Sequence, residues 1–165
     1  MKKYIQPILT TLLFLFSVNS FATTYDWRGT TDTSWATASN WFPATGVPST
    51  GDVVTISSHT KMPLLVANTT ISQITMTSGT LDCNGLTLTI TSTSSFNGGT
   101  INNGTVICSG TSTLTFAGTT FGAAVNATGN SIILNGSKFN STFTAVKKGT
   151  SNDNGSGGNY FSGAV

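Results

Sequence analysis

Charge is scarce in this chain. Charged residues make up 7% of the 165 positions, and all five acidic residues are aspartates, so glutamate is missing altogether. Two of the seven basic residues, Lys2 and Lys3, lie in a predicted export signal. Seven minus two leaves five basic against five acidic side chains, a net charge of zero. Without a basic stripe to neutralise phosphates, the chain is not expected to bind nucleic acid.

Groups suited to catalysis or metal binding are equally few. His59 is the single histidine, and its Ser/Thr/Lys-rich turn favours a solvated turn residue over a catalyst. With no second histidine and no Cys-x-x-Cys pair, the sequence predicts no metal site and no cofactor. Calcium at Asn152–Gly155 is a weaker alternative, because the EF-hand spacing and its closing glutamate are missing.

An enzyme is also disfavoured by the carboxylates. Glycosidases need two opposed carboxylates, one acting as acid and the other as base or nucleophile. The aspartates here are scattered along the chain, at Asp26, Asp32, Asp52, Asp82 and Asp153. We therefore expect no enzymatic activity, and a fragment of a β-helical polysaccharide-degrading enzyme is the weakest of three functional hypotheses.

The only long apolar run stands at the start of the chain. Two lysines precede the run Ile8–Val18, and Ser20-Phe-Ala22 follows with small residues at its first and last positions. This order is typical of a secretory signal peptide cleaved after Ala22. The run is shorter than the ~20 residues of a spanning helix, which disfavours a membrane anchor. We predict a signal peptide over residues 1–22, no membrane span in the mature chain, and a secreted or outer cell-surface location.

Thr, Ser, Asn and Gly make up about half of the remaining residues. Thr favours strands, whereas Gly and Asn favour turns, so we expect an all-β protein with many short strands. Two cysteines, Cys83 and Cys108, would enter an oxidising compartment after export. A disulfide between them is allowed but not implied, and two buried free thiols are an equal alternative.

A repeat with a period near 20 residues organises the chain after the tryptophan-rich segment. The windows begin at Met76, Phe96, Phe116 and Leu134, so they lie 20, 20 and 18 residues apart, and each has a second apolar residue five places later. The third place is glycine in three of them (Gly98, Gly118 and Gly136). Such a period with several short strands is typical of a β-solenoid. A β-sandwich is the disfavoured alternative, because its turns recur at shorter intervals.

On this basis we predict a right-handed parallel β-helix or β-solenoid of about four coils. The first apolar residues would stack as one internal ladder about 4.8 Å apart. A second ladder would contain Leu81, Ile101, Phe121 and Phe139. The glycines would mark the bends between the two ladders.

The C-terminal end breaks this pattern. Residues 147–159, from Lys147 to Asn159, are predicted to form an exposed loop inserted into one coil. Phe161-Ser-Gly163 is interpreted as the start of a further repeat, at the first ladder position. Because no polar cap follows, we expect residues 57–165 to be solenoid coils truncated at the C-terminus, with end-to-end self-association of the fragment as a consequence.

All three tryptophans, Trp27, Trp35 and Trp41, lie within fifteen residues of one another. They precede Val53–Ile56, which we expect to be the first strand, followed by Pro63–Val66. We predict that residues 23–56 form an N-terminal cap with this strand, since large flat rings can cover the open end of a solenoid. The alternative is an exposed aromatic platform that binds a sugar through the same three residues.

The tryptophan pattern and Gly46-Val-Pro48-x-x-Gly51-Asp52, followed by Thr/Gly-rich coils, resemble the N-terminal region of large secreted repeat proteins of Bacteroidetes-type bacteria. Those are β-helical and adhesin-like, and some resemble autotransporter passenger domains. The resemblance implies a secreted or cell-surface structural or adhesive protein without enzymatic activity, and it implies surface glycans or other cell-surface components as partners. An extracellular carbohydrate-binding module is the second hypothesis.

Overall fold

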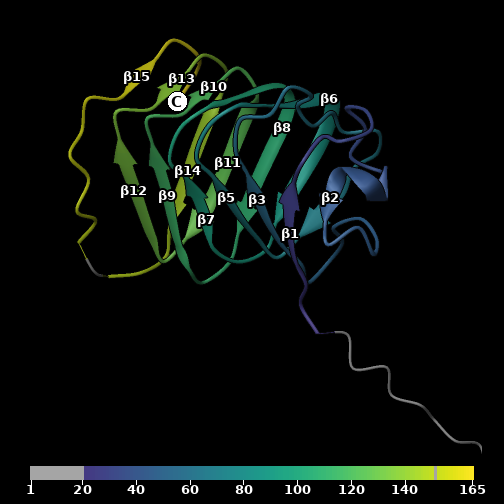
Figure 1. Ribbon diagram of the computed structural model, residues 1–165. Helices are drawn as coiled ribbons and strands as arrows, with labels where there is room; N and C mark the ends of the chain where they lie inside the picture. Colours follow the sequence, from purple (N-terminus) through teal and green to yellow (C-terminus); the bar gives the residue numbers. More distant parts are fainter. Residues whose placement is uncertain (1–20, 151) are drawn as a thin grey trace, which may run out of the picture.

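Parallel strands stack into a right-handed β-solenoid in the computed structural model, which describes residues 21–150 and 152–165 (Figure 1). One face, here named the front sheet, contains β1 (Thr24–Trp27), β3 (Val53–Ile56), β5 (Gln73–Met76), β7 (Ser94–Phe96), β9 (Thr113–Ala117) and β12 (Ser131–Asn135). Each of these six strands belongs to one turn, so the prediction of about four coils was too low.

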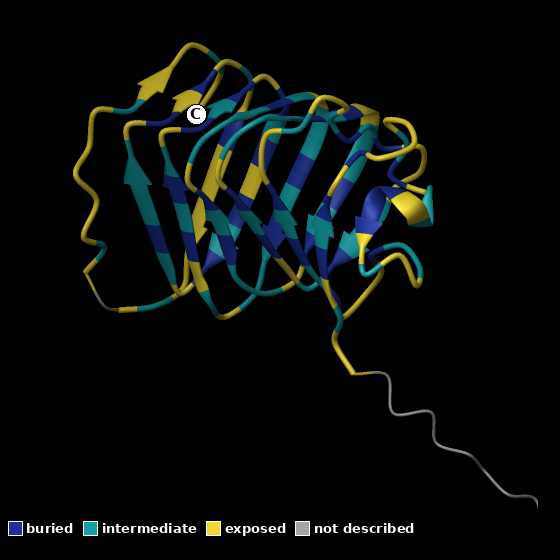
Figure 2. Cartoon of the chain, viewed as in Figure 1, coloured by how far each residue is buried: buried dark blue, intermediate teal, exposed yellow. Residues whose placement is uncertain are grey.

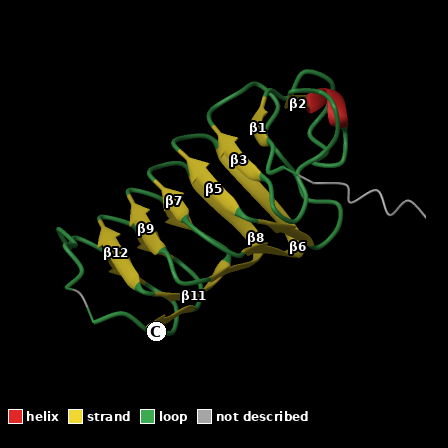
Figure 3. Cartoon of the chain, turned by 90° about the horizontal axis from the view of Figure 1, so that it is seen from below, coloured by secondary structure: helices red, strands yellow, loops and turns green. Residues whose placement is uncertain are grey.

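A second sheet wraps round the rest of each turn. Its strands are β4 (Thr69–Ile71), β6 (Thr80–Ile90), β8 (Thr100–Ser109), β10 (Thr120–Phe121), β11 (Ala124–Gly129), β13 (Lys138–Phe139), β14 (Phe143–Lys147) and β15 (Tyr160–Phe161). The start of β8 pairs with β10 and its end with β11, so this long strand covers two faces. Figure 3 shows β6, β8 and β11 across the core from the front sheet.

The long strands bend at asparagine–glycine corners. Asn84 and Asn103 have φ angles of 53° and 54°, in the left-handed region that asparagine tolerates better than most residues. Glycine follows each of them in the sequence, at Gly85 and Gly104. These corners let one continuous strand contribute to two sides of the solenoid.

Both predicted internal ladders are confirmed by the strand register. Met76, Phe96, Phe116 and Leu134 face one another across β5, β7, β9 and β12. Leu81, Ile101, Phe121 and Phe139 do so in the second sheet. Gly98, Gly118 and Gly136 have positive φ angles at the predicted bends. Figure 2 shows that buried positions recur along the strands of both sheets.

Aromatic rings dominate the C-terminal half of this core. Phe96 stacks on Phe116 with 5.5 Å between ring centroids, and Phe121 stacks on Phe139 at 5.1 Å. Phe161 stacks on Phe139 at 5.0 Å and pairs with it in the strand register. The interpretation of Phe161 as a first ladder position was therefore wrong, because it extends the second ladder.

The chain after β14 is also placed differently from the prediction. Within residues 152–157, Asp153 accepts hydrogen bonds from the Ser131 hydroxyl at 2.5 Å and from the Ile132 amide at 3.1 Å. Gly157 forms a parallel bridge with Asn135. This segment is irregular and largely exposed, as predicted, but it lies against β12 as part of a further turn and is not inserted into a coil.

The N-terminal boundary was also predicted too late. β1 pairs in parallel with β3 and belongs to the first turn, so the expectation that Val53–Ile56 is the first strand was wrong. The predicted strand Pro63–Val66 is reduced to parallel bridges from Leu64 to Ser34 and Asp82. Residues 1–20 of the predicted signal peptide lie outside the described part of the chain. Within the described ranges, no helix is long and apolar enough to cross a membrane.

Candidate functional site

The three tryptophans lie together at the N-terminal end of the solenoid. They are 1%, 3% and 1% exposed at Trp27, Trp35 and Trp41, respectively. Trp41 is the central ring, with Trp27 edge-on at 4.9 Å and Trp35 edge-on at 4.6 Å. Sugar stacking needs an exposed ring face, and none of the three offers one. Their packing is that of an aromatic core at the end of a coil.

The segment that carries these rings also covers the edge of the front sheet. β2 (Trp41–Phe42) pairs antiparallel with β1, and η1 (Ala38–Asn40), a single 3₁₀ turn, leads into it. The indole N–H of Trp41 donates to the Trp35 carbonyl at 2.8 Å. That of Trp27 donates to the Lys61 carbonyl at 2.7 Å. The outer side of β1 is thus occupied by a strand of opposite direction, which prevents the parallel stack from continuing there.

Asn40 is a fully buried polar residue that organises this segment. Its side-chain oxygen accepts from the Thr31 and Asp32 amides at 2.9 and 3.1 Å. Its amide nitrogen donates to the Asp32 carboxylate at 2.6 Å and to the Ser34 carbonyl at 2.9 Å. The bond from the Asn40 side chain to the carboxylate, with that from the Ser34 amide, holds the pKa of Asp32 below its ordinary value. Sequence reasoning missed Asn40, because nothing in its neighbours marks an asparagine as buried.

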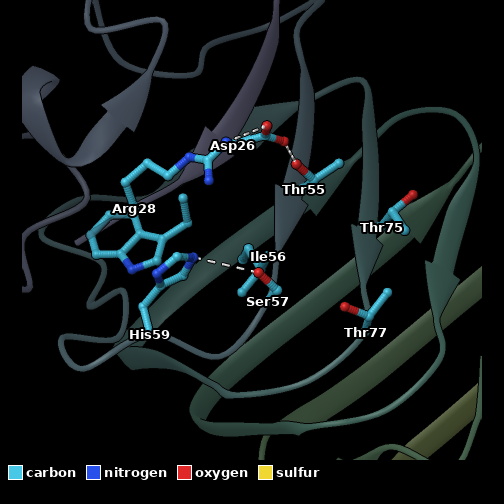
Figure 4. A pocket seen from close by; sticks show the side chains of 9 residues that line it. Asp26, Arg28, Thr55, Ile56, Ser57, His59, Thr75 and Thr77 are labelled. Carbon is cyan, nitrogen blue, oxygen red and sulfur yellow. Dashed lines mark hydrogen bonds and ion pairs between the residues drawn. The ribbon is translucent and has the colours of Figure 1, made fainter. Parts of the chain in front are cut away.

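A shallow pocket of about 210 Å³ opens on the front sheet beside the tryptophan segment. Its lining comes from the first three turns: Asp26, Trp27 and Arg28 at β1, Thr55, Ile56, Ser57 and His59 at and after β3, and Thr75 and Thr77 at and after β5 (Figure 4). These residues are up to about fifty positions apart in the chain. The parallel register brings them together.

An ion pair forms one side of the pocket. The Arg28 guanidinium lies 3.2 Å from the Asp26 carboxylate, with both side chains nearly half exposed. The Thr55 hydroxyl donates to the other oxygen of Asp26, as Figure 4 shows. Arg28 also lies over the ring of Phe42, with its central carbon 5.6 Å from the ring centroid. The ring and the carboxylate together hold the guanidinium in place.

His59 lies on the rim of the same pocket. Its Nε2 is 3.4 Å from the Ser57 hydroxyl, which is long for a hydrogen bond. Its backbone amide donates to the Met62 sulfur at 3.2 Å. The half-buried His59 lies in the irregular segment after β3, between strands as predicted, but it lines a pocket that the sequence did not reveal.

A column of hydroxyl groups continues from the pocket along the front sheet. Thr55, Thr75, Ser95 and Thr115 are direct neighbours in the strand register. All four are half-buried residues on strand positions that alternate with the inward ladder. Asp26 precedes them and Ile133 follows. The outer face of the sheet therefore presents polar groups at one-strand intervals of about 4.8 Å.

The remaining carboxylates are engaged by neighbouring groups. Asp32 and Asp52 accept backbone amide hydrogens. Asp82 accepts from the Asn84 amide and the Asn103 side chain. Asp153, in the segment considered for calcium, forms an ion pair with Lys147 at 3.0 Å. No cluster of three or more potential metal ligands occurs within residues 21–150 and 152–165.

Both cysteines are buried and free, one of the two alternatives that the sequence left open. Burial raises the pKa of each thiol to about 12. Cys108 occupies an inward position between Ile90 and Ala127 in the second sheet, whereas Cys83 lies at the Asn84 corner. The thiols therefore act as small apolar side chains in this state.

The chain matches no protein-family model, and no curated protein or solved structure shows significant similarity to it. The resemblance to secreted adhesin-like repeat proteins thus stays a prediction from sequence motifs.

Proposed function

We propose that this chain is a secreted or cell-surface structural and adhesive repeat protein with no catalytic activity of its own. The observation that carries the proposal is the front sheet: six stacked strands whose outward positions form a continuous, mostly hydroxyl-bearing column. Solenoids use such extended surfaces for binding. A rigid core of interlocked ladders keeps the surface in register.

The exterior composition supports an extracellular setting. A surface rich in hydroxyl and amide groups stays hydrated without charge. The apolar start with its small residues before Thr23 predicts export. The two thiols are inaccessible in the folded chain, which suits an oxidising compartment.

Carbohydrate binding is the second candidate function, and one observation favours it. The pocket beside the tryptophan segment contains a carboxylate, a guanidinium and several hydroxyls on one open face. These groups, and not the three buried tryptophans, would contact a ligand. In that case, sugar binding at the pocket would be the means by which the solenoid adheres to a surface.

Adhesion under flow tests the main proposal. Beads carrying the purified full chain would be passed over glass coated with mucin, with cellulose or with intact bacteria, and compared with albumin-coated beads. We expect retention above the albumin level on at least one surface, with no release of reducing sugar. Retention equal to albumin on all three surfaces, or steady release of reducing ends, would contradict it.

A further inference from the structure

We propose that a neutral, linear polysaccharide binds along the front sheet, with one sugar unit in the pocket formed by Asp26, Arg28 and Thr75. This inference rests on the proposed adhesive function and specifies its partner. The polysaccharide would follow the axis of the solenoid from the pocket toward the C-terminal turns. The charge, the hydrogen-bonding groups and the repeat distance of this face all suit such a polymer.

The charge of the pocket favours a neutral ligand. Asp26 and Arg28 form a pair at 3.2 Å, so their charges largely cancel. Thr55, Ile56 and Thr75 from β3 and β5 carry no charge, and His59 on the rim is the one other titratable side chain of the lining. An acidic polymer would meet the Asp26 carboxylate, and a basic one would meet the Arg28 guanidinium. Neither sign gains a net attraction here.

The bonding groups match sugar hydroxyls. A hydroxyl group both donates and accepts, and neighbouring hydroxyls on a sugar ring form pairs. The Arg28 guanidinium has five N–H donors, and one of its nitrogens faces Asp26. The carboxylate of Asp26 retains lone pairs beyond those used by Arg28 and Thr55. A donor and an acceptor fixed side by side therefore suit a vicinal diol.

The arrangement of this face also limits the size and direction of the ligand. A volume of about 210 Å³ is smaller than the pockets that enclose drug-sized ligands, and it suits a single sugar ring. Beyond the pocket, Thr75, Ser95 and Thr115 continue in register. They are spaced at about 4.8 Å, close to the advance of an extended sugar chain per unit. A polymer can thus meet one hydroxyl group per turn.

Oligosaccharide titration tests the inference on the full chain. The probes are cellohexaose, xylohexaose and mannohexaose, their disaccharides, and hexagalacturonate as the acidic comparison, followed by calorimetry and ligand-observed NMR. We expect at least one neutral hexasaccharide to bind, about ten-fold more tightly than its disaccharide. Hexagalacturonate should bind more weakly than that hexasaccharide.

Matched variants locate the site. Thr75→Val keeps the shape and strand propensity but removes one hydroxyl, so affinity should fall about five-fold. Arg28→Gln should weaken binding about ten-fold or more, because hydrogen bonds to charged groups are stronger. Thr115→Val should weaken the hexasaccharide and leave the disaccharide unchanged. The control is Thr89→Val, a half-buried outward threonine on β6 of the second sheet, with an expected change below two-fold.

Several outcomes would overturn the inference. These are no binding by any neutral hexasaccharide, tighter binding of hexagalacturonate, or equal losses in Thr75→Val and Thr89→Val. Circular dichroism of each variant would show that the fold is intact. If the beads adhere under flow while no hexasaccharide binds, the glycan inference fails and the adhesive function stands.

Discussion

Replacing Phe116 with alanine should uncouple the two halves of the solenoid. Phe116 is fully buried in β9, in the fifth turn of the front sheet. Its ring stacks on Phe96 in the preceding turn at 5.5 Å and meets Phe143, in the following turn, edge-on at 5.9 Å. In a solenoid each turn contacts only its neighbours. A cavity at this position therefore weakens the interface between the N-terminal and C-terminal turns.

The size of the effect follows from the burial of Phe116. Truncation of a fully buried phenylalanine costs about 3–5 kcal/mol through lost burial and the remaining cavity. A domain of this size is stable by roughly 5–15 kcal/mol. With a urea m-value of about 2 kcal/mol/M, a loss of about 4 kcal/mol lowers the midpoint by about 2 M. The matched control, Phe42→Ala, removes a ring that is 62% exposed together with its contact to Arg28, so its cost should stay within about 1 kcal/mol.

Two signals distinguish the halves during urea unfolding. Tryptophan fluorescence reports on the N-terminal segment, where all three indoles lie, and far-ultraviolet circular dichroism reports on every strand. In Phe116→Ala we expect the dichroism transition to begin at lower urea than the fluorescence transition, because the C-terminal turns separate first. A variant in which both signals keep the wild-type midpoint would refute the ladder packing derived for Phe116.

Three further predictions concern other parts of the chain. Asn40→Ala leaves the Thr31 and Asp32 amides without their partner, so urea unfolding should show a loss of about 3 kcal/mol in stability. The tryptophan emission of this variant should also shift to the red. The control Asn126→Ala, at an exposed position, should change stability by less than about 0.5 kcal/mol. The pKa of Asp32 is lowered in the folded state from its ordinary 3.8, so its stabilising contribution is present above pH 3.8 and is lost as pH falls through the folded pKa. The melting temperatures of wild type and Asp32→Asn should therefore converge on acidification. A difference in melting temperature that stays constant with pH would contradict this. Burial raises the pKa of Cys83 and Cys108 to about 12. Mass spectrometry should therefore find neither thiol alkylated by iodoacetamide at pH 8 until urea unfolds the chain. Rapid labelling of the folded chain would contradict this, because it would show that the thiols are accessible.

The ladders could be predicted from the sequence because the repeat fixes the register. Met76, Phe96 and Phe116 recur at 20-residue spacing, so stacking them also fixes the positions of all the remaining residues in those turns. The first turn was missed because the long segment between Trp27 and Val53, which contains Trp35 and Trp41, breaks the spacing. Phe161 was misplaced because Phe-Ser-Gly matches the repeat in letters only: Gly163 lies against the Ser141 carbonyl, where a side chain would not fit, and does not have a positive φ angle.

The pocket could not be predicted for a different reason. Asp26, Thr55 and Thr75 are neighbours only because β1, β3 and β5 pair in one register, and the sequence did not identify β1 as a strand of the front sheet. Without β1, Asp26 was assigned to a cap and His59 to an isolated turn. The role of the tryptophans was left open by the sequence, since their clustering fits both a cap and an exposed sugar-binding platform. Only their packing around Trp41 shows that the rings are buried from solvent.

Surface labelling of intact cells that produce the protein tests the central claim most directly. A membrane-impermeant biotin ester would label exposed lysines such as Lys138 and Lys148, and sequencing of the recovered chain would define its N-terminus. We predict a biotinylated chain that begins at Thr23. An unlabelled chain recovered from the cytosol with residues 1–22 still attached would contradict an exported surface protein.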